Sequence, residues 1–196
     1  EFIIFKRRNN ANFWCVWHEA IGDDYKLALH LTDGLDADGA FMASTLPTST
    51  NITVGGASVN TNADGGTYIC YAFSPIQGYS KFGSYVGNGA ANNGPFVYLG
   101  FKPAFVMIKS TTATGGHLMW DLKRSSFNLM DDIINAAEAD AESTNGIYGM
   151  DALSNGFKIM NTGTNNGTNQ SGVTYVYYAF AENPFVTSTG VPTTAR

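Results

Sequence analysis

The chain has 196 residues and a formal charge of −5, and it contains only eleven lysines and arginines. So few cations exclude the basic stripe that neutralises nucleic-acid phosphates, and they exclude strong attraction to an anionic membrane surface. Aromatic residues make up 13% of the chain and charged residues 14%, a balance that excludes an intrinsically disordered chain. Because no apolar run approaches the roughly 20 residues of a membrane-spanning helix, no membrane insertion is expected.

Short strands separated by turns are the dominant pattern along the chain. The predicted strands are rich in β-branched and aromatic residues, and clusters of Gly, Asn, Ser and Thr separate them. Turn sequences such as Gly87-Asn88-Gly89 tolerate the positive φ angles that tight hairpins need. The pattern predicts an all-β, antiparallel chain. In chain order, the predicted strands are Phe2–Lys6, Phe13–His18, Leu27–Leu31, Asn51–Val54, Thr67–Phe73, Phe82–Val86, Pro95–Leu99, Ala104–Lys109, His117–Leu122, Gly156–Met160 and Val173–Phe180.

One stretch of sequence occurs twice. Thr67–Phe73 returns as Thr174–Phe180, 107 residues further along (67 to 174), and five of the seven residues are identical. Two further matches lie earlier in the chain, in the same order and at nearly the same offset. The chain therefore contains an internal repeat of about a hundred residues. The earlier matches pair Phe2–Lys6 with Phe105–Lys109 and Trp17 with Trp120, both at an offset of 103 (2 to 105, 17 to 120).

The repeated strand has no strongly polar face. Alternation puts Thr67, Ile69, Tyr71 and Phe73 on one side, and Tyr68, Cys70 and Ala72 on the other. This composition predicts an inner strand of a two-sheet sandwich, covered on both sides.

The segment Leu129–Glu142 interrupts the strand pattern. It has helical propensity, and its apolar residues fall near a 3.6-residue period, so the sequence leaves a short helix and a loop equally open. The corresponding part of the first copy, Leu29–Met42, contains Gly/Asp turn signals and is predicted to be a loop. Residues 187–196 are rich in Ser, Thr and Pro and are predicted to form an extended tail.

No metal or cofactor site is predicted. Cys15 and Cys70 lie in apolar runs and are read as reduced, buried thiols, and the three histidines lack the spacing of metal ligands. The segment Asp33–Gly39 resembles a calcium loop weakly, but its spacing is wrong and no closing Glu follows. No phosphate-binding glycine motif occurs in the chain.

Two polar segments are candidate functional sites. Glu138, Asp140 and Glu142 would present three carboxylates on one face if the segment were a strand, as a retaining glycosidase requires, but a solvated acidic segment is the preferred interpretation. The second segment is Trp120–Arg124. Its charged side chains either bind a sugar, with Trp120 or Tyr148 as the aromatic stacking surface, or form a salt bridge at the end of a strand. Its candidate ligand-contact residues are Trp120, Asp121, Arg124 and Tyr148.

Four phrases resemble sequences of tailed-phage virion proteins: Gly78–Gly89, Gly94–Lys109, Leu153–Lys158 and Thr174–Phe185. Together they resemble the repeated C-terminal domain of tail-fibre-like proteins, especially those of marine and cyanobacterial phages. The resemblance implies tandem antiparallel β-sandwich units of a concanavalin-like or jelly-roll-like type. We expect a partial first repeat over residues 1–77, a complete second repeat over residues 78–186 and the tail over residues 187–196.

The first unit departs from the family pattern. The family unit begins with strands like those in Gly78–Gly89 and Gly94–Phe101, whereas the first unit starts directly at its Phe2–Lys6 strand. The first sandwich is therefore expected to be incomplete, and the chain is expected to be a fragment whose natural N-terminus lies upstream.

The resemblance implies a structural component of a phage virion appendage, a tail fibre or fibre tip, in the extracellular phage particle. Expected partners are other virion proteins, further copies of the chain (a trimer, on the resemblance alone) and a host-surface glycan. No enzymatic activity is expected. The alternatives are a head-decorating or purely structural virion protein and, less favoured, a concanavalin-like glycan hydrolase.

Overall fold

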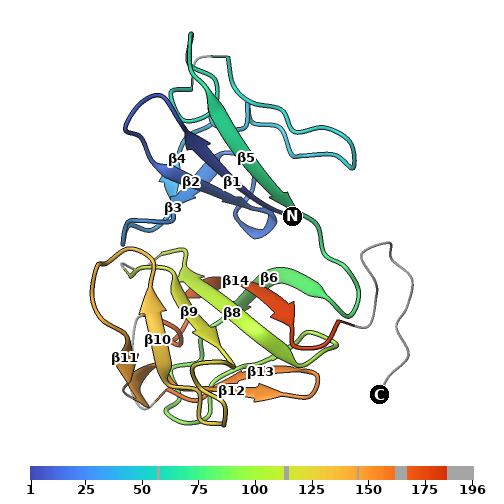
Figure 1. Ribbon diagram of the computed structural model, residues 1–196, viewed down its shortest axis with the longest axis vertical. Coiled ribbons are helices and arrows are strands. Elements are labelled where there is room, and N and C mark those ends of the chain that lie inside the picture. Colours follow the sequence, from blue (N-terminus) through green and yellow to red (C-terminus); the bar gives the residue numbers. More distant parts are fainter. Residues whose placement is uncertain (57, 113–114, 145, 162–166, 185–196) are drawn as a thin grey trace.

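The computed structural model describes residues 1–56, 58–112, 115–144, 146–161 and 167–184 (Figure 1). Within these residues the chain is all-β, as predicted, with two short 3-10 helices, η1 (Glu19–Ile21) and η2 (Gly146–Tyr148), and no α-helix. The predicted tail over residues 187–196 lies outside the described residues. The strands are β1 (Phe2–Arg7), β2 (Trp14–His18), β3 (Tyr25–Ala28), β4 (Asp36–Ala37), β5 (Tyr68–Phe73), β6 (Ser80–Val86), β7 (Phe96–Tyr98), β8 (Pro103–Ser110), β9 (Leu118–Asp121), β10 (Asp132–Asn135), β11 (Ser143–Thr144), β12 (Met150–Leu153), β13 (Gly156–Ile159) and β14 (Thr174–Ala181).

The strands form three antiparallel sheets. Sheet I has the strand order β4-β3-β2-β1-β5, sheet II has the order β11-β10-β9-β8-β14-β6, and sheet III has the order β12-β13-β7. Sheet II lies between the other two sheets, as Figure 1 shows. Open antiparallel sheets stacked face to face are the arrangement of β-sandwich proteins.

Sheets I and II repeat each other strand by strand. In sheet I Ile3 of β1 lies opposite Trp17 of β2, and in sheet II Val106 of β8 lies opposite Trp120 of β9. Beyond these pairs, β3 and β4 extend sheet I in the same order as β10 and β11 extend sheet II. The internal repeat of the sequence is therefore also a repeat of backbone pairing.

Sheet II has one strand more than sheet I. β14 lies between β8 and β6, whereas β5, which carries the same sequence pattern, pairs with β1 and forms the edge of sheet I. The prediction of an inner strand covered on both sides is therefore wrong for the first copy, because in the described part of the chain no equivalent of β6 pairs with the far edge of β5, and its central residues are exposed. In the second copy β14 is such an inner strand, with Tyr175 to Ala179 all buried.

The side chains of β14 serve two cores because they alternate across the sheet. Tyr175, Tyr177 and Ala179 belong to the core between sheets II and III, together with Trp120 and Phe157. The next residues along the strand point to the other face of sheet II. Val176 and Tyr178 pack there against Phe2, Val16 and Leu27 of sheet I.

Both units of the repeat thus contribute to one apolar interface. The predicted boundary between residues 77 and 78 falls in the connection from Phe73, where β5 ends, to Ser80, where β6 begins. The division into two units stays a prediction. The far face of sheet I is covered by a loop instead of a third sheet, with Phe41 and Met42 packed fully buried against its strands.

Several predicted elements differ from the structure. The helix considered for Leu129–Glu142 is absent: residues 132–135 form β10, because pairing with β9 and burial of Ile133 outweigh helical propensity. The predicted strand Asn51–Val54 is not a strand. The sequence patterns did not indicate β4, β11 or β12, which are two to four residues long.

Candidate functional site

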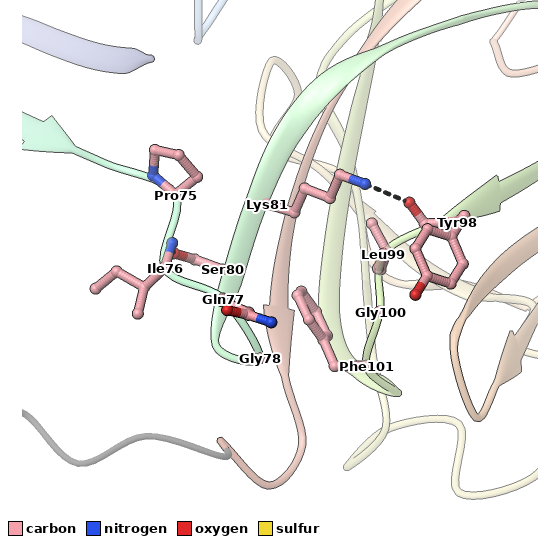
Figure 2. A pocket seen from close by; sticks show the side chains of 10 residues that line it. All are labelled: Pro75, Ile76, Gln77, Gly78, Ser80, Lys81, Tyr98, Leu99, Gly100 and Phe101. Atoms are coloured by element: carbon pink, nitrogen blue, oxygen red, sulfur yellow. Dashed lines mark hydrogen bonds between the residues drawn. The ribbon is translucent and has the colours of Figure 1, made fainter. Parts of the chain in front are cut away.

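A pocket with an aromatic wall lies where sheets II and III meet (Figure 2). One wall is the connection from β5 to β6, and the other is the end of β7 with the turn that follows it. The cavity has a volume of about 430 Å³, enough for one or two sugar-sized rings. Its lining residues are Pro75, Ile76, Gln77, Gly78, Ser80, Lys81, Tyr98, Leu99, Gly100 and Phe101.

The first wall is a turn held by one serine. Ser80 Oγ accepts a hydrogen bond from the Ile76 N–H at 3.1 Å and donates one to the Ser74 carbonyl at 3.1 Å. The Tyr79 N–H closes the turn on the Ile76 carbonyl at 2.9 Å. Gly78 has a φ of 74°, a left-handed conformation that glycine adopts without steric cost. The turn therefore presents Gln77 at the pocket without relying on a ligand for its shape.

The second wall centres on Tyr98, which is 59% exposed. Lys81 Nζ donates a hydrogen bond to the Tyr98 carbonyl at 2.8 Å and lies 5.2 Å from the centre of the Tyr98 ring. Gly100 has a φ of 85°, and a Cβ at that position would lie 3.5 Å from the Tyr98 hydroxyl. Figure 2 shows Gln77, Lys81 and Tyr98 around one opening, with Phe101 below.

The pocket combines an apolar floor with an exposed aromatic ring and one cation. Phe101 is buried and gives the pocket an apolar floor, while Tyr98 offers an aromatic face with a polar edge. Of the lining residues Lys81 alone is charged, and its ammonium group already holds the Tyr98 carbonyl. The lining therefore lacks the pair of carboxyl groups that glycoside hydrolysis requires.

Of the four residues predicted to contact a ligand, Trp120 and Asp121 lie on β9 of sheet II, Arg124 follows β9 and Tyr148 lies in η2. Trp120 is fully buried, and its Nε1 donates a hydrogen bond to the Tyr148 carbonyl at 3.0 Å. Asp121 forms a salt bridge with Arg124 at 2.8 Å and accepts hydrogen bonds from the Lys123 and Arg124 N–H groups. The indole of Trp120 thus presents no exposed face for stacking in this structure. A ligand contact at these residues stays a prediction.

The acidic segment is not on a strand. Glu138, Asp140 and Glu142 are exposed and lie in the connection from β10 to β11. Glu142 contacts Arg124 at 3.4 Å. The three carboxylates therefore do not share the face of a concave sheet.

The calcium-like segment has a structural partner. Lys26 of β3 is 4% exposed and contacts Asp36 at 2.5 Å and Asp38 at 3.0 Å. These acids neutralise a cation that folding has removed from water. The described residues contain no group of three or more His, Cys, Asp or Glu side chains placed to hold a metal ion.

A buried polar cluster between sheets I and II was not predicted. His18 and His117 both pack against Tyr178, with ring centres 5.2 Å and 6.1 Å from the tyrosine ring. Among the described residues, both ring nitrogens of His117 and the Tyr178 hydroxyl are buried without a hydrogen-bond partner. Nδ1 of His18 accepts a hydrogen bond from the Ala20 N–H at 3.0 Å. The three residues lie 61 to 160 positions apart in the sequence (117 to 178, 18 to 178), so no local spacing could reveal the cluster.

Burial dominates the titration of this cluster. It lowers the pKa of His18 to about 4, against a smaller opposing effect of the Tyr177 backbone. It lowers the pKa of His117 to about 3, with a further contribution from Lys109. Lys109 is itself buried, which lowers its pKa to about 8. Both histidines are therefore neutral at pH 7.

The pocket residues were also missed by the sequence analysis. Alternation along Pro95–Leu99 separates exposed Phe96 and Tyr98 from buried Val97 and Leu99, a signal of an aromatic surface. It could not show that Gln77 and Lys81 complete the pocket, because that depends on how sheets II and III meet.

The fold and site define an all-β protein of stacked antiparallel sheets, with a repeated sheet and a surface pocket. The chain belongs to the family described as Domain of unknown function (DUF7483), whose model matches residues 1–184 and so spans both copies of the repeat. No curated protein and no solved structure matches the chain. Among the described elements, none is a helix long and apolar enough to cross a membrane.

Proposed function

We propose that this protein is a structural component of a phage virion appendage, a tail fibre or fibre tip, and that its pocket beside Tyr98 binds a host-surface glycan. A single observation supports the proposal most: the pocket is lined mainly by the segments that resemble phage tail-fibre-like proteins. Two of the phrases that resemble phage tail-fibre-like proteins, Gly78–Gly89 and Gly94–Lys109, supply most of the pocket lining.

The chemistry of the pocket supports a carbohydrate ligand. A sugar ring has an apolar face, which suits the ring of Tyr98, and a rim of hydroxyl groups, which suits the Gln77 amide and the backbone of the two turns. The hydrogen bonds of Ser80 and Lys81 fix both walls before binding, so little conformational entropy is lost when a ligand binds.

The stacked sheets support the role of a rigid carrier. Three sheets share two apolar cores, and the pocket lies on short turns anchored to strands of sheets II and III. In such an appendage the partners are other virion proteins and further copies of the chain, with a trimer expected from the resemblance. The protein acts by binding and not by catalysis under this proposal.

A glycan array with wild-type protein and two variants tests the binding site. Tyr98→Ala is expected to weaken the strongest glycan signals at least tenfold, while Phe127→Ala leaves them unchanged. Phe127 is a matched control because it is 84% exposed and does not line the pocket. Equal signals for all three proteins would refute the glycan site. Immunogold labelling of purified phage particles tests the location, and label confined to host cells would refute the virion role.

A further inference from the structure

The outer edge of β5 is built like an inner strand but has no neighbouring strand in the described part of the chain. β5 is six residues long and carries no charge, proline or glycine. Natural proteins usually blunt such edges with charges, prolines or bulges, because an unpaired apolar edge recruits another strand. The other strands at sheet edges are shorter or contain a lysine or glycine, as β6 does with Lys81 and Gly83.

The backbone groups that face this edge follow from the pairing with β1. The Arg8 N–H donates to the Thr67 carbonyl, so Thr67 points its polar groups towards β1. Polar groups alternate along an antiparallel strand, so Tyr68, Cys70 and Ala72 point their N–H and C=O groups to the open side. The second copy shows the same alternation, because the Thr111 N–H donates to the Thr174 carbonyl.

The second copy also shows what covers such an edge. There β6 runs antiparallel to β14, with Gly83 opposite Tyr177 and Phe82 opposite Tyr178. In the described part of the chain the first copy lacks this neighbour, and its side chains are more exposed. Ile69 is 37% exposed and Tyr71 is 41% exposed, whereas the matching Val176 and Tyr178 are fully buried.

We propose that the outer edge of β5 binds one extended, antiparallel strand with the sequence pattern of Ser80–Val86, contributed by another copy of this repeat. By the register of the second copy, the guest residue that matches Gly83 lies opposite Cys70, and the residue that matches Phe82 lies opposite Tyr71. The guest strand completes sheet I to the strand order of sheet II. This mode of recognition is β-augmentation, in which backbone hydrogen bonds supply affinity and alternate side chains supply specificity.

The outer edges of β14 and β5 differ in the residue that they require in the neighbouring strand. A Cβ at Gly83 would lie 2.7 Å from the Tyr177 hydroxyl, so β14 needs glycine there. The first copy has Cys70 in place of Tyr177, and Cys70 is exposed and not in a disulfide. The β5 edge therefore accepts a larger guest residue opposite Cys70, and this gives a direct test of register.

A synthetic peptide with the sequence of residues 79–87 (YSKFGSYVG) is the probe. When it is added to the protein at saturating concentration, amide exchange is expected to slow at least tenfold at Tyr68, Cys70 and Ala72. Exchange at Ile69 and Tyr71 should stay unchanged, since these groups already face β1. Protection at all five amides, or at none, would overturn the proposal.

Disulfide trapping tests the register. The peptide carrying Cys in place of Gly83 is expected to crosslink to Cys70 in oxidised glutathione, because directly opposed Cα atoms about 5.5 Å apart suit a disulfide. The peptide carrying Cys in place of Ser84 should crosslink at least tenfold less, since its side chain leaves the other face. Equal yields from the two peptides would contradict the register.

A pair of protein variants separates strand pairing from other binding. Cys70→Pro removes the outward N–H, on an edge strand where proline is tolerated, and is expected to lower peptide affinity at least tenfold. Cys70→Ser keeps the N–H and should bind like wild type, with circular dichroism confirming that both variants fold. Undiminished binding by Cys70→Pro, or self-pairing of β5 with β5 seen as a peptide-resistant dimer, would overturn the proposal.

Discussion

Tyr71 and Tyr178 hold the same position in the two copies of the repeat, yet Tyr71 is 41% exposed and Tyr178 is fully buried. The difference arises because β14 has a strand on each side and lies between two sheets, while β5 has neither. Tyr178→Ala is expected to lower the free energy of unfolding by about 3–5 kcal/mol, as large core truncations do. Tyr71→Ala should cost less than about 1 kcal/mol. Urea denaturation of both variants measures the contrast, and similar losses would show that the two positions are equally packed.

Within the described ranges the Tyr178 hydroxyl is buried and has no hydrogen-bond partner, so removing it should not lower stability. Tyr178→Phe is expected to leave the unfolding free energy unchanged or raise it by about 1 kcal/mol. Tyr85→Phe is the matched control, because the Tyr85 hydroxyl donates to the Thr168 carbonyl at 2.7 Å. That change should cost about 1–3 kcal/mol. Thermal and chemical denaturation measure which of the two variants is less stable. A larger loss of stability for Tyr178→Phe would show that the Tyr178 hydroxyl has a hydrogen-bond partner.

Acid should destabilise the interface between sheets I and II. The folded-state pKa values of His18 and His117 are lowered to about 4 and about 3, below the value of about 6.5 expected in the unfolded chain. The unfolded state therefore binds more protons below pH 6.5, and stability falls as the pH drops through that window towards the folded values. The expected loss is about 2 kcal/mol per histidine between pH 7 and pH 5.

The variant His117→Gln isolates one of these contributions. Its stability should change about half as much as that of wild type between pH 7 and pH 5, because one titrating group remains buried. This interval lies mostly above the titration of ordinary carboxylates, which limits their contribution. His30→Gln is the control, since His30 lies outside the cluster, in the turn after β3, where its ring packs against Phe13. An unchanged pH profile in His117→Gln would contradict the assignment.

Trp120 should behave as a core residue. It is fully buried in the core between sheets II and III, and Trp120→Ala is expected to lower the unfolding free energy by about 3–5 kcal/mol. Arg124→Ala removes a partly exposed salt bridge and should cost about 1 kcal/mol or less. If Trp120→Ala abolished glycan binding while stability stayed at the wild-type value, Trp120 would be a ligand contact after all.

The acidic segment offers a test of the hydrolase alternative. The double variant Glu138→Gln and Glu142→Gln is expected to release no less polysaccharide fragment than wild type, because both side chains lie in an exposed connection. Reducing-end assays on host polysaccharide measure the release. Activity in wild type that disappears in the double variant would establish the hydrolase.

The candidate site was harder to predict than the fold. Strand patterns placed the repeated strand, the Trp17 and Trp120 strands and the Gly156–Met160 strand close to their observed positions. They failed at Leu129–Glu142, where helical propensity lost to pairing with β9, a contact between segments about fifteen residues apart. The pocket and the histidine cluster depend on contacts between residues that are still further apart in the sequence.

The sequence by itself determined the all-β class and the internal repeat, because strand alternation and repeated phrases are local properties of the chain. Only the tertiary structure decided which copy of the repeated strand is buried. Thr67–Phe73 and Thr174–Phe180 are nearly the same sequence, but burial depends on the neighbours that each strand meets. β6 and the flanking sheets cover β14, whereas no strand of the described chain pairs with the outer edge of β5.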